Sequence, residues 1–349
     1  LNLLLLFFLF LYFTSCGSKL IRGLKLTSFQ QSQEKIELNK KNMLSLKFKT
    51  KEPNKVVKIF EKSTNIMQYI SEMEFDKSKM DKIVDEFTFG LPGKYYINLY
   101  FSASLTSLKN LFRDCKDLVK VDFSELVTTN IVDTSYLFYG CNKLKYAYFD
   151  NFDTSKVENM ENMFNGCTNL VELDLTNFDS SKVRDMNGMF AECKEILGLN
   201  LNYFDTSNVV RMDSMFDGCK FLMSVNMTKF DTSKVYNMSR MFANCETLPI
   251  LNISHFITSQ VRSMEAMFYN CKKLEELNLN TWDTSLVTSF RDLFYGCMKI
   301  FIIHLGKFNT ENIVNMGNMF TKCVNLTYVD LRNFATKKVV SMENMFNGC

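Results

Sequence analysis

Residues 167–193 decide the fold, and they read CTNLVELDLTNFDSSKVRDMNGMFAEC. The first half alternates apolar and polar residues at Leu173, Asp174 and Leu175, which predicts a short strand with one buried face. The second half spaces its apolar residues three or four apart, which predicts a helix with one buried side. These residues are Val183, Met186, Met189, Phe190 and Cys193. The stretch therefore predicts a strand–helix unit.

This unit recurs with a period of 26 residues. Cysteines mark the period at positions 115, 141, 167, 193, 219, 245, 271, 297, 323 and 349. Disulfide frameworks and zinc motifs do not space cysteines evenly, whereas tandem repeats do. The strand half follows the leucine-rich-repeat pattern L-x-x-L-x-L-x-x-F. The sequence thus predicts an α/β fold, a right-handed leucine-rich-repeat solenoid of tandem 26-residue strand–helix units with an N-terminal lead-in and cap.

The repeat cysteines and methionines admit several roles. We favour core packing for both, because they lie on the apolar side of the predicted helix and behave there as small or adaptable hydrophobic side chains. Alternating disulfides or a metal site are the other interpretations of the cysteines. A metal or flexible-ligand site is the other interpretation of the methionines at 160, 186, 212, 238, 264, 316 and 342. The residue before most repeat cysteines is Gly or Asn, which predicts a positive φ there.

Residues 1–18 resemble a signal peptide. The apolar run Leu3–Phe13 has 11 residues, and a membrane span needs about 20. The small residues that follow it lead to Cys16, and Phe13 to Cys16 resemble a lipobox, which makes Cys16 a candidate lipidation site. A lipid-anchored, a plainly secreted and a signal-anchored form remain open. Because the chain begins without Met, we expect its true N-terminus to be missing.

Three further segments follow. Residues 19–84 carry no repeat and are expected to form a small α+β lead-in or a partly ordered stalk. Residues 85–114 are interpreted as a degenerate N-terminal cap that covers the first strand edge. Residues 115–349 hold the repeats. Since a solenoid needs a polar terminal cap, we expect the array to continue beyond Cys349.

One row of outward strand residues is the candidate binding site. Its members are Asp122, Tyr148, Asp174, Asn200, Asn226, Asn252, Asn278, His304 and Asp330. Strand faces of leucine-rich repeats are common docking surfaces, and a solvated polar ladder is the alternative interpretation. The repeated Asp-Thr-Ser run, as at Asp153, is interpreted as helix capping, with a cation ladder as the alternative.

Composition excludes several classes of function. The chain has only two histidines, His255 and His304, so a His-based metal site or a Ser/His/Asp triad is not expected. The net charge of +3 gives no excess of Lys and Arg for nucleic acid. We therefore predict no enzyme, no cofactor and no nucleic-acid partner, with membrane contact only through a lipid anchor.

Asn151 to Cys167 carry a family resemblance. They match N-F-D-T-S-K-V-x-N-M-x-x-M-F-x-x-C, which resembles the 26-residue repeat of BspA-like leucine-rich-repeat surface proteins and of mycoplasma-type lipoproteins. The resemblance covers about Phe101 to Cys349. It implies a cell-surface or secreted protein used in adhesion or host contact, and it brings no catalytic residues.

The predicted function is non-catalytic binding. We expect a secreted or surface-tethered repeat protein that binds a protein or another cell-surface macromolecule through its strand face. The alternative is the ectodomain of a larger receptor or enzyme whose functional domain lies beyond residue 349. A structural coat component is a third interpretation.

Overall fold

The computed structural model describes residues 42–349, which contain thirteen strands and one short 3₁₀ helix. The N-terminal part holds β1 (Met43–Thr50), β2 (Lys55–Lys58), η1 (Asn65–Tyr69), β3 (Ile70–Phe75), β4 (Ser78–Lys79), β5 (Glu86–Phe89) and β6 (Gly93–Phe101). The repeats hold β7 (Leu118–Asp122), β8 (Tyr146–Tyr148), β9 (Gly198–Asn200), β10 (Ser224–Asn226), β11 (Glu276–Asn278), β12 (Ile302–His304) and β13 (Tyr328–Val329). No helix in this range is long and apolar enough to cross a membrane. The predicted signal segment with Cys16 and residues 19–41 lie outside the described residues.

Strand β1 joins the N-terminal part to the repeats. It pairs antiparallel with β6 on one edge and with β7 on the other. Because β7 also pairs with β8, one six-stranded sheet has the order β4-β3-β6-β1-β7-β8. Strands on both sides of the predicted boundary at residue 85 pair as well, since β2 and β5 form a separate antiparallel sheet. The strand that covers the edge of β7 is thus β1, from the predicted lead-in.

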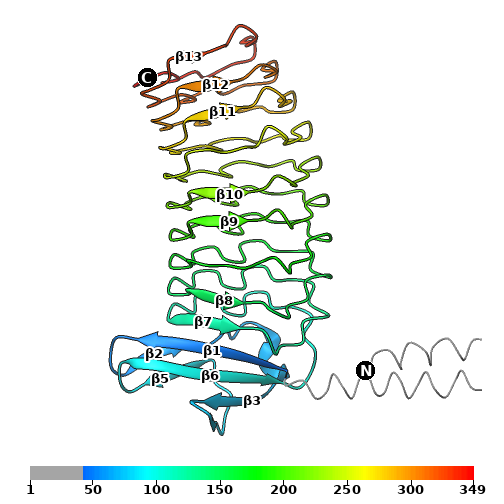
Figure 1. Ribbon diagram of the computed structural model, residues 1–349, viewed down its shortest axis with the longest axis vertical. Helices are drawn as coiled ribbons and strands as arrows, with labels where there is room; N and C mark the ends of the chain where they lie inside the picture. The colour runs from blue at the N-terminus through cyan, green and yellow to red at the C-terminus, as the bar shows by residue number, and fades with distance from the viewer. Residues whose placement is uncertain (1–41) are drawn as a thin grey trace, which may run out of the picture. The chain divides into compact units, whose positions relative to one another are not determined.

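Each 26-residue repeat forms one coil of the chain, and successive coils stack on one another (Figure 1). Parallel bridges join equivalent residues of neighbouring coils, such as Asn159 with Asp185 and Asp185 with Arg211. Strands β9 and β10 pair in this register, and so do β11, β12 and β13. The stacking therefore places every repeat position in a column that runs from coil to coil.

The second half of each coil is a run of turns. The N–H of Met163 donates to the carbonyl of Met160 at 3.3 Å, which closes a turn inside one coil. The N–H of the next residue, Phe164, donates instead to the carbonyl of Met189 in the following coil at 2.9 Å. In an α-helix both groups would donate four residues back along the same segment. Asn162 has a φ of 53°, which a helix interior does not tolerate.

The predicted strand–helix leucine-rich-repeat solenoid is therefore wrong. Residues 42–349 contain no α-helix, and their strands form four separate sheets instead of one continuous strand layer. The apolar spacing has another physical origin, because consecutive turns also return a side chain to the core every three residues. The predicted helix capping is wrong for the same reason. Asp179 Oδ1 accepts the N–H of Ser181 at 2.9 Å and so closes a local turn.

Buried threonine hydroxyls link consecutive coils. Thr154 Oγ1 donates to the carbonyl of Asp179 at 2.9 Å and accepts the N–H of the same residue at 2.7 Å. The same reciprocal contact joins Thr206 to Asp231, Thr232 to Ile257 and Thr284 to Asn309. A buried polar group needs such partners, because water cannot supply them. The Asp-Thr-Ser run thus closes a turn with its Asp and holds the next coil with its Thr.

Apolar columns form the core between the two sides of each coil. Met189, Phe190 and Cys193 have no exposed surface, as predicted. The ring of Phe190 is stacked between those of Phe164 and Phe216, with both centroid distances at 5.8 Å. Such stacked aromatic contacts add to the free energy gained by burying the rings.

The repeat cysteines are free thiols, so the core-packing interpretation is confirmed and the alternating-disulfide interpretation is wrong. Nine of the ten are buried, and Cys349 is exposed in the last described coil. Each described repeat thiol donates to a carbonyl of the core, as Cys193 Sγ does to Phe164 at 3.2 Å. The cysteine column therefore packs in the core and also links one coil to the preceding one.

The residue before each repeat cysteine has a positive φ, as its Gly and Asn residues predict. Gly166 has a φ of +79°, and a Cβ there would lie 3.2 Å from backbone atoms of Gly140. Glu192 and Lys322 hold the same conformation, with φ of 57° and 62°. A left-handed conformation costs an L-residue about 1–2 kcal/mol. Glycine avoids this cost at its own position, although Tyr136, Ser214 and Asp292 hold a positive φ four residues earlier in glycine-containing coils.

Candidate binding surface

The strand positions of the coils form an exposed face. In β8, β9 and β11 the central residue is buried and both flanking residues are exposed. The predicted row occupies one flanking position. Its members Asp122, Tyr148, Asn200, Asn226, Asn278 and His304 lie in strands, Asp330 directly follows β13, and Asp174 and Asn252 lie in coils without an assigned strand. All nine are exposed or half-exposed, and the parallel register places Asp122 beside Tyr148, Asn200 beside Asn226 and Asn278 beside His304.

Most of the row side chains close the turn that ends their strand. Asn200 Oδ1 accepts the N–H of Asn202 at 3.3 Å, and Asn226 Oδ1 accepts that of Thr228 at the same distance. Asn278 repeats the contact at 3.2 Å. Each amide oxygen is therefore fixed, while the amide nitrogens of these three residues donate to no group among residues 42–349. The row thus presents oriented hydrogen-bond donors, spaced by the strand separation of about 4.8 Å.

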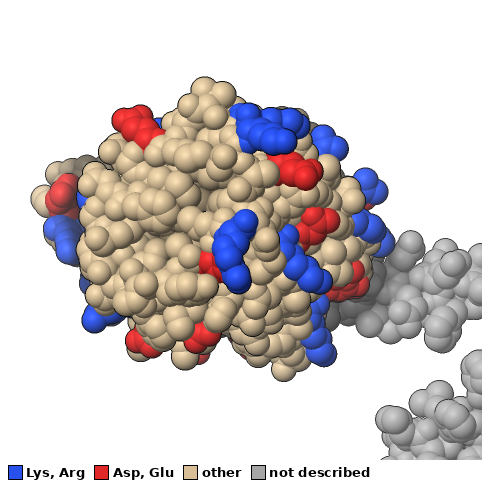
Figure 2. Space-filling view, turned by 90° about the horizontal axis from the view of Figure 1, so that it is seen from above, with Lys and Arg blue, Asp and Glu red and all other residues tan. Residues whose placement is uncertain are grey.

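Charges on the row are mostly balanced by neighbours. Burial raises the pKa of Asp122, but hydrogen bonds from Ser124 and the charge of Lys120 outweigh it and lower the pKa below its usual value. The Lys120 ammonium is 3.5 Å from that carboxylate. Hydrogen bonds from Arg332 lower the pKa of Asp330 to about 2. Figure 2 shows basic and acidic side chains mixed around one end of the stack.

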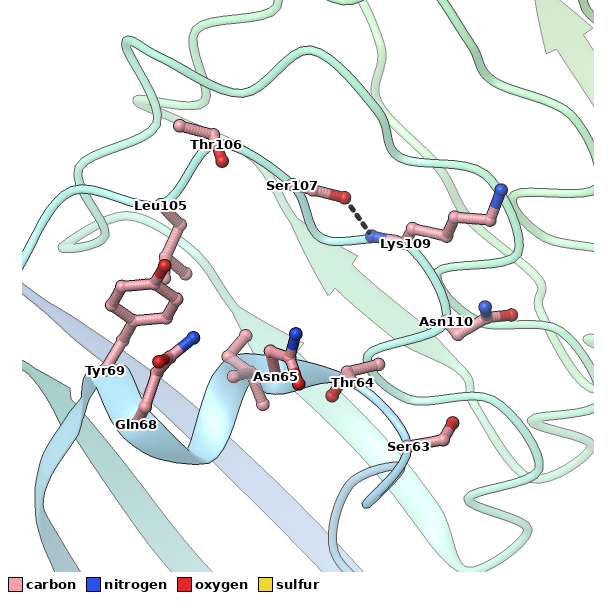
Figure 3. Close-up of a pocket in the computed structure, with 11 residues that line it drawn as sticks. Ser63, Thr64, Asn65, Gln68, Tyr69, Leu105, Thr106, Ser107, Lys109 and Asn110 are labelled. Carbon is pink, nitrogen blue, oxygen red and sulfur yellow. Dashed lines mark hydrogen bonds between the residues drawn. The ribbon is translucent and has the colours of Figure 1, made fainter.

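A polar pocket lies away from the row, between η1 and the first coil (Figure 3). Its volume is about 380 Å³, and its lining offers hydroxyl and amide groups from Ser63, Asn65 and Gln68 together with Lys109. No carboxylate, imidazole or thiol lines it. Ser107 Oγ accepts the backbone N–H of Lys109 at 3.1 Å, on the side of the pocket formed by the first coil.

Sequence reasoning missed the neighbours of Tyr148. Tyr146 lies two residues earlier in β8 and presents its ring on the same face, with ring planes 2° apart and centroids 6.4 Å apart. Asp150 and Glu172 join these rings and Asp174 around a groove of about 200 Å³. The signal was present in the alternation Tyr146-Ala-Tyr148, because residues two apart in a strand share a face.

One family model matches most of the repeat region. It is described as Mycoplasma protein of unknown function, DUF285, and it matches residues 106–200, 192–295 and 270–349. No curated protein matches the chain, and no solved structure does. The match supports the tandem repeat and the mycoplasma-type resemblance, whereas it does not test the relation to BspA-like proteins.

Proposed function

We propose that this chain, which belongs to the family described as Mycoplasma protein of unknown function, DUF285, is a non-catalytic binding protein whose strand face holds an extended macromolecule. The observation that carries the proposal is the row of oriented, unpartnered amide donors at Asn200, Asn226 and Asn278. An extended polypeptide or glycan offers acceptors along a line and can meet several donors at once. Each donor contributes about 0.5–1.5 kcal/mol when it is satisfied.

Adhesion at a cell surface is the setting that we propose for this binding. The resemblance of Asn151 to Cys167 to the repeat of BspA-like surface proteins supports it, and so does the sequence of the first 18 residues, which resembles a lipoprotein signal ending near Cys16. A leucine-rich-repeat architecture is not part of the proposal. The partner is a protein or another cell-surface macromolecule, and contact with the membrane is through a lipid anchor.

Conversion of three row asparagines to aspartate should abolish adhesion. In the variant Asn200→Asp, Asn226→Asp, Asn278→Asp, each side chain keeps the oxygen that closes its turn and loses the outward donor. Three lost hydrogen bonds at about 1 kcal/mol each correspond to an affinity loss on the order of 100-fold. Retention of beads coated with the full chain on cultured cell monolayers, measured under flow, checks this result.

The matched control changes another exposed column. Asn130→Asp, Asn208→Asp and Gln260→Glu introduce the same charge in positions that Lys156 and Lys234 occupy in other coils. This control should keep full bead retention. Its melting temperature is measured alongside, because the amides of Asn130 and Asn208 donate to Ser104 Oγ and to the carbonyl of Ser181. Equal retention of the row variant and the unmodified chain would contradict the proposed function.

A further inference from the structure

We infer that the groove between Tyr146, Tyr148, Asp150, Glu172 and Asp174 binds a basic side chain, lysine or arginine, of a partner polypeptide. The inference rests on the proposed function, because the groove belongs to the same strand face. It opens where the strand ladder is interrupted: β8 pairs only with β7, and residues 171–175 of the next coil form no strand. The resulting cavity of about 200 Å³ is smaller than the roughly 300–1,000 Å³ of most small-molecule pockets. That size suits a single side chain.

Two tyrosine rings form one wall of the groove. Tyr146 and Tyr148 are 38% and 41% exposed. Aromatic faces attract cations through their quadrupole, and the attraction grows when water is excluded. The ring of Tyr148 already holds one cation, because Lys120 Nζ from the preceding coil lies 4.3 Å from its centroid. The geometry of this ring is thus compatible with an ammonium group.

Uncompensated carboxylates form the other wall. Asp150, Glu172 and Asp174 make no ion pair within residues 42–349, and no lysine or arginine lines the groove. Two carboxylates of the row have a basic neighbour, at 3.5 Å for Asp122 with Lys120 and 2.7 Å for Asp330 with Arg332. The groove therefore offers unpaired negative charge to the positive charge of a partner.

The arrangement of the carboxylates favours an organic cation over a metal ion. No group of three His, Cys, Asp or Glu residues in the described part of the chain is arranged to hold a metal. Carboxylates that flank a groove without converging can instead accept hydrogen bonds from the separate N–H groups of a guanidinium or ammonium. The N–H of Thr176 donates to Asp174 Oδ1 at 3.0 Å and fixes the orientation of that carboxylate.

Tyrosine ring signals of the full chain report on this site directly. The probes are end-blocked Gly-Gly-Lys-Gly-Gly and Gly-Gly-Arg-Gly-Gly, titrated into protein with ¹³C-labelled tyrosine rings and followed by NMR. Tyr146→Phe and Tyr148→Phe assign the two signals. We expect saturable shifts of both signals, weakened by added salt and absent with the same peptide carrying acetyl-lysine. Tyr148→Leu, and separately Glu172→Gln with Asp174→Asn, should weaken binding at least fivefold.

Tyr203→Leu is the matched control, since Tyr203 is an exposed tyrosine outside the groove. It should leave the peptide affinity unchanged. Equal binding of the acetyl-lysine peptide, a lack of saturation, or groove shifts produced by CaCl₂ alone would each overturn the inference. If the row variant loses adhesion but the peptides do not bind, the groove inference is wrong and the proposed function stands. If the peptides bind but the row variant keeps full adhesion, the proposed function is wrong and the groove inference stands.

Discussion

Phe190→Ala should lower the free energy of unfolding by about 3–5 kcal/mol, the usual cost of truncating a buried aromatic residue. Phe190 is fully buried, and its ring is stacked on both sides, so the cavity would open in the middle of a column. Neighbouring coils can close it only by breaking their hydrogen-bond register. This substitution should therefore destabilise the chain far more than any change on the exposed strand face. Chemical denaturation of the full chain, followed by tyrosine fluorescence, measures it.

Lys182→Ala is the matched control in the same coil. Lys182 is exposed and makes no ion pair within residues 42–349, so its truncation should change the free energy of unfolding by less than about 0.5 kcal/mol. Equal effects of the two substitutions would show that the Phe column does not lie in the core.

Nine repeat thiols should resist alkylation in native buffer and react fully after denaturation. Burial raises the pKa of Cys193 and Cys219 well above the usual range for a thiol, and it raises that of Cys323 to about 12. At pH 8 a raised pKa leaves few thiolates, and the thiolate is the reactive form. Iodoacetamide labelling followed by mass spectrometry should therefore find Cys115 to Cys323 unlabelled before denaturation.

The labelling is repeated after denaturation without a reductant. All ten repeat cysteines, Cys115 to Cys349, should then carry the label, because the described cysteines are free thiols. Cys16 is followed separately by peptide mapping, since it lies outside the described residues. Denatured but unreduced protein that takes up almost no label would contradict the thiol column and indicate disulfides.

The sequence predicted the 26-residue period and which side chains are buried or exposed. It did not predict the backbone conformation. The burial of Met189, Phe190 and Cys193 and the exposure of Asn200 follow from hydrophobicity alone. Helix and consecutive turns share a spacing of three, so this pattern could not separate them. Gly188 and its counterpart Asn162 were a partial signal against the helix, because Tyr136, Arg240 and Ala266 hold the same positive φ in other coils without favouring it.

The binding face was predictable in part. The alternation of apolar and polar strand residues was enough to predict the row. The groove also depends on where the pairing between strands of neighbouring coils stops. That interruption between β8 and residues 171–175 arises from the stacking of whole coils. No pattern inside a single repeat encodes it, so Asp150 and Glu172 could be assigned to the site only from the structure.

The row is one continuous surface made by stacked coils, and the distance between two spin labels on it tests this arrangement. The variant Asp122→Cys with Asp330→Cys, in which Cys16 and Cys349 are replaced by serine, places labels eight coils apart, while the nine buried native thiols stay unlabelled. At about 4.8 Å per coil, pulsed electron paramagnetic resonance should give a distance of about 38 Å. The variant Asp174→Cys with Asp330→Cys, six coils apart, should give about 29 Å. Distances of about 38 Å and about 29 Å would show that the row runs along stacked coils. Equal distances for the two pairs, or a distance below about 20 Å for the pair at 122 and 330, would contradict the stacking.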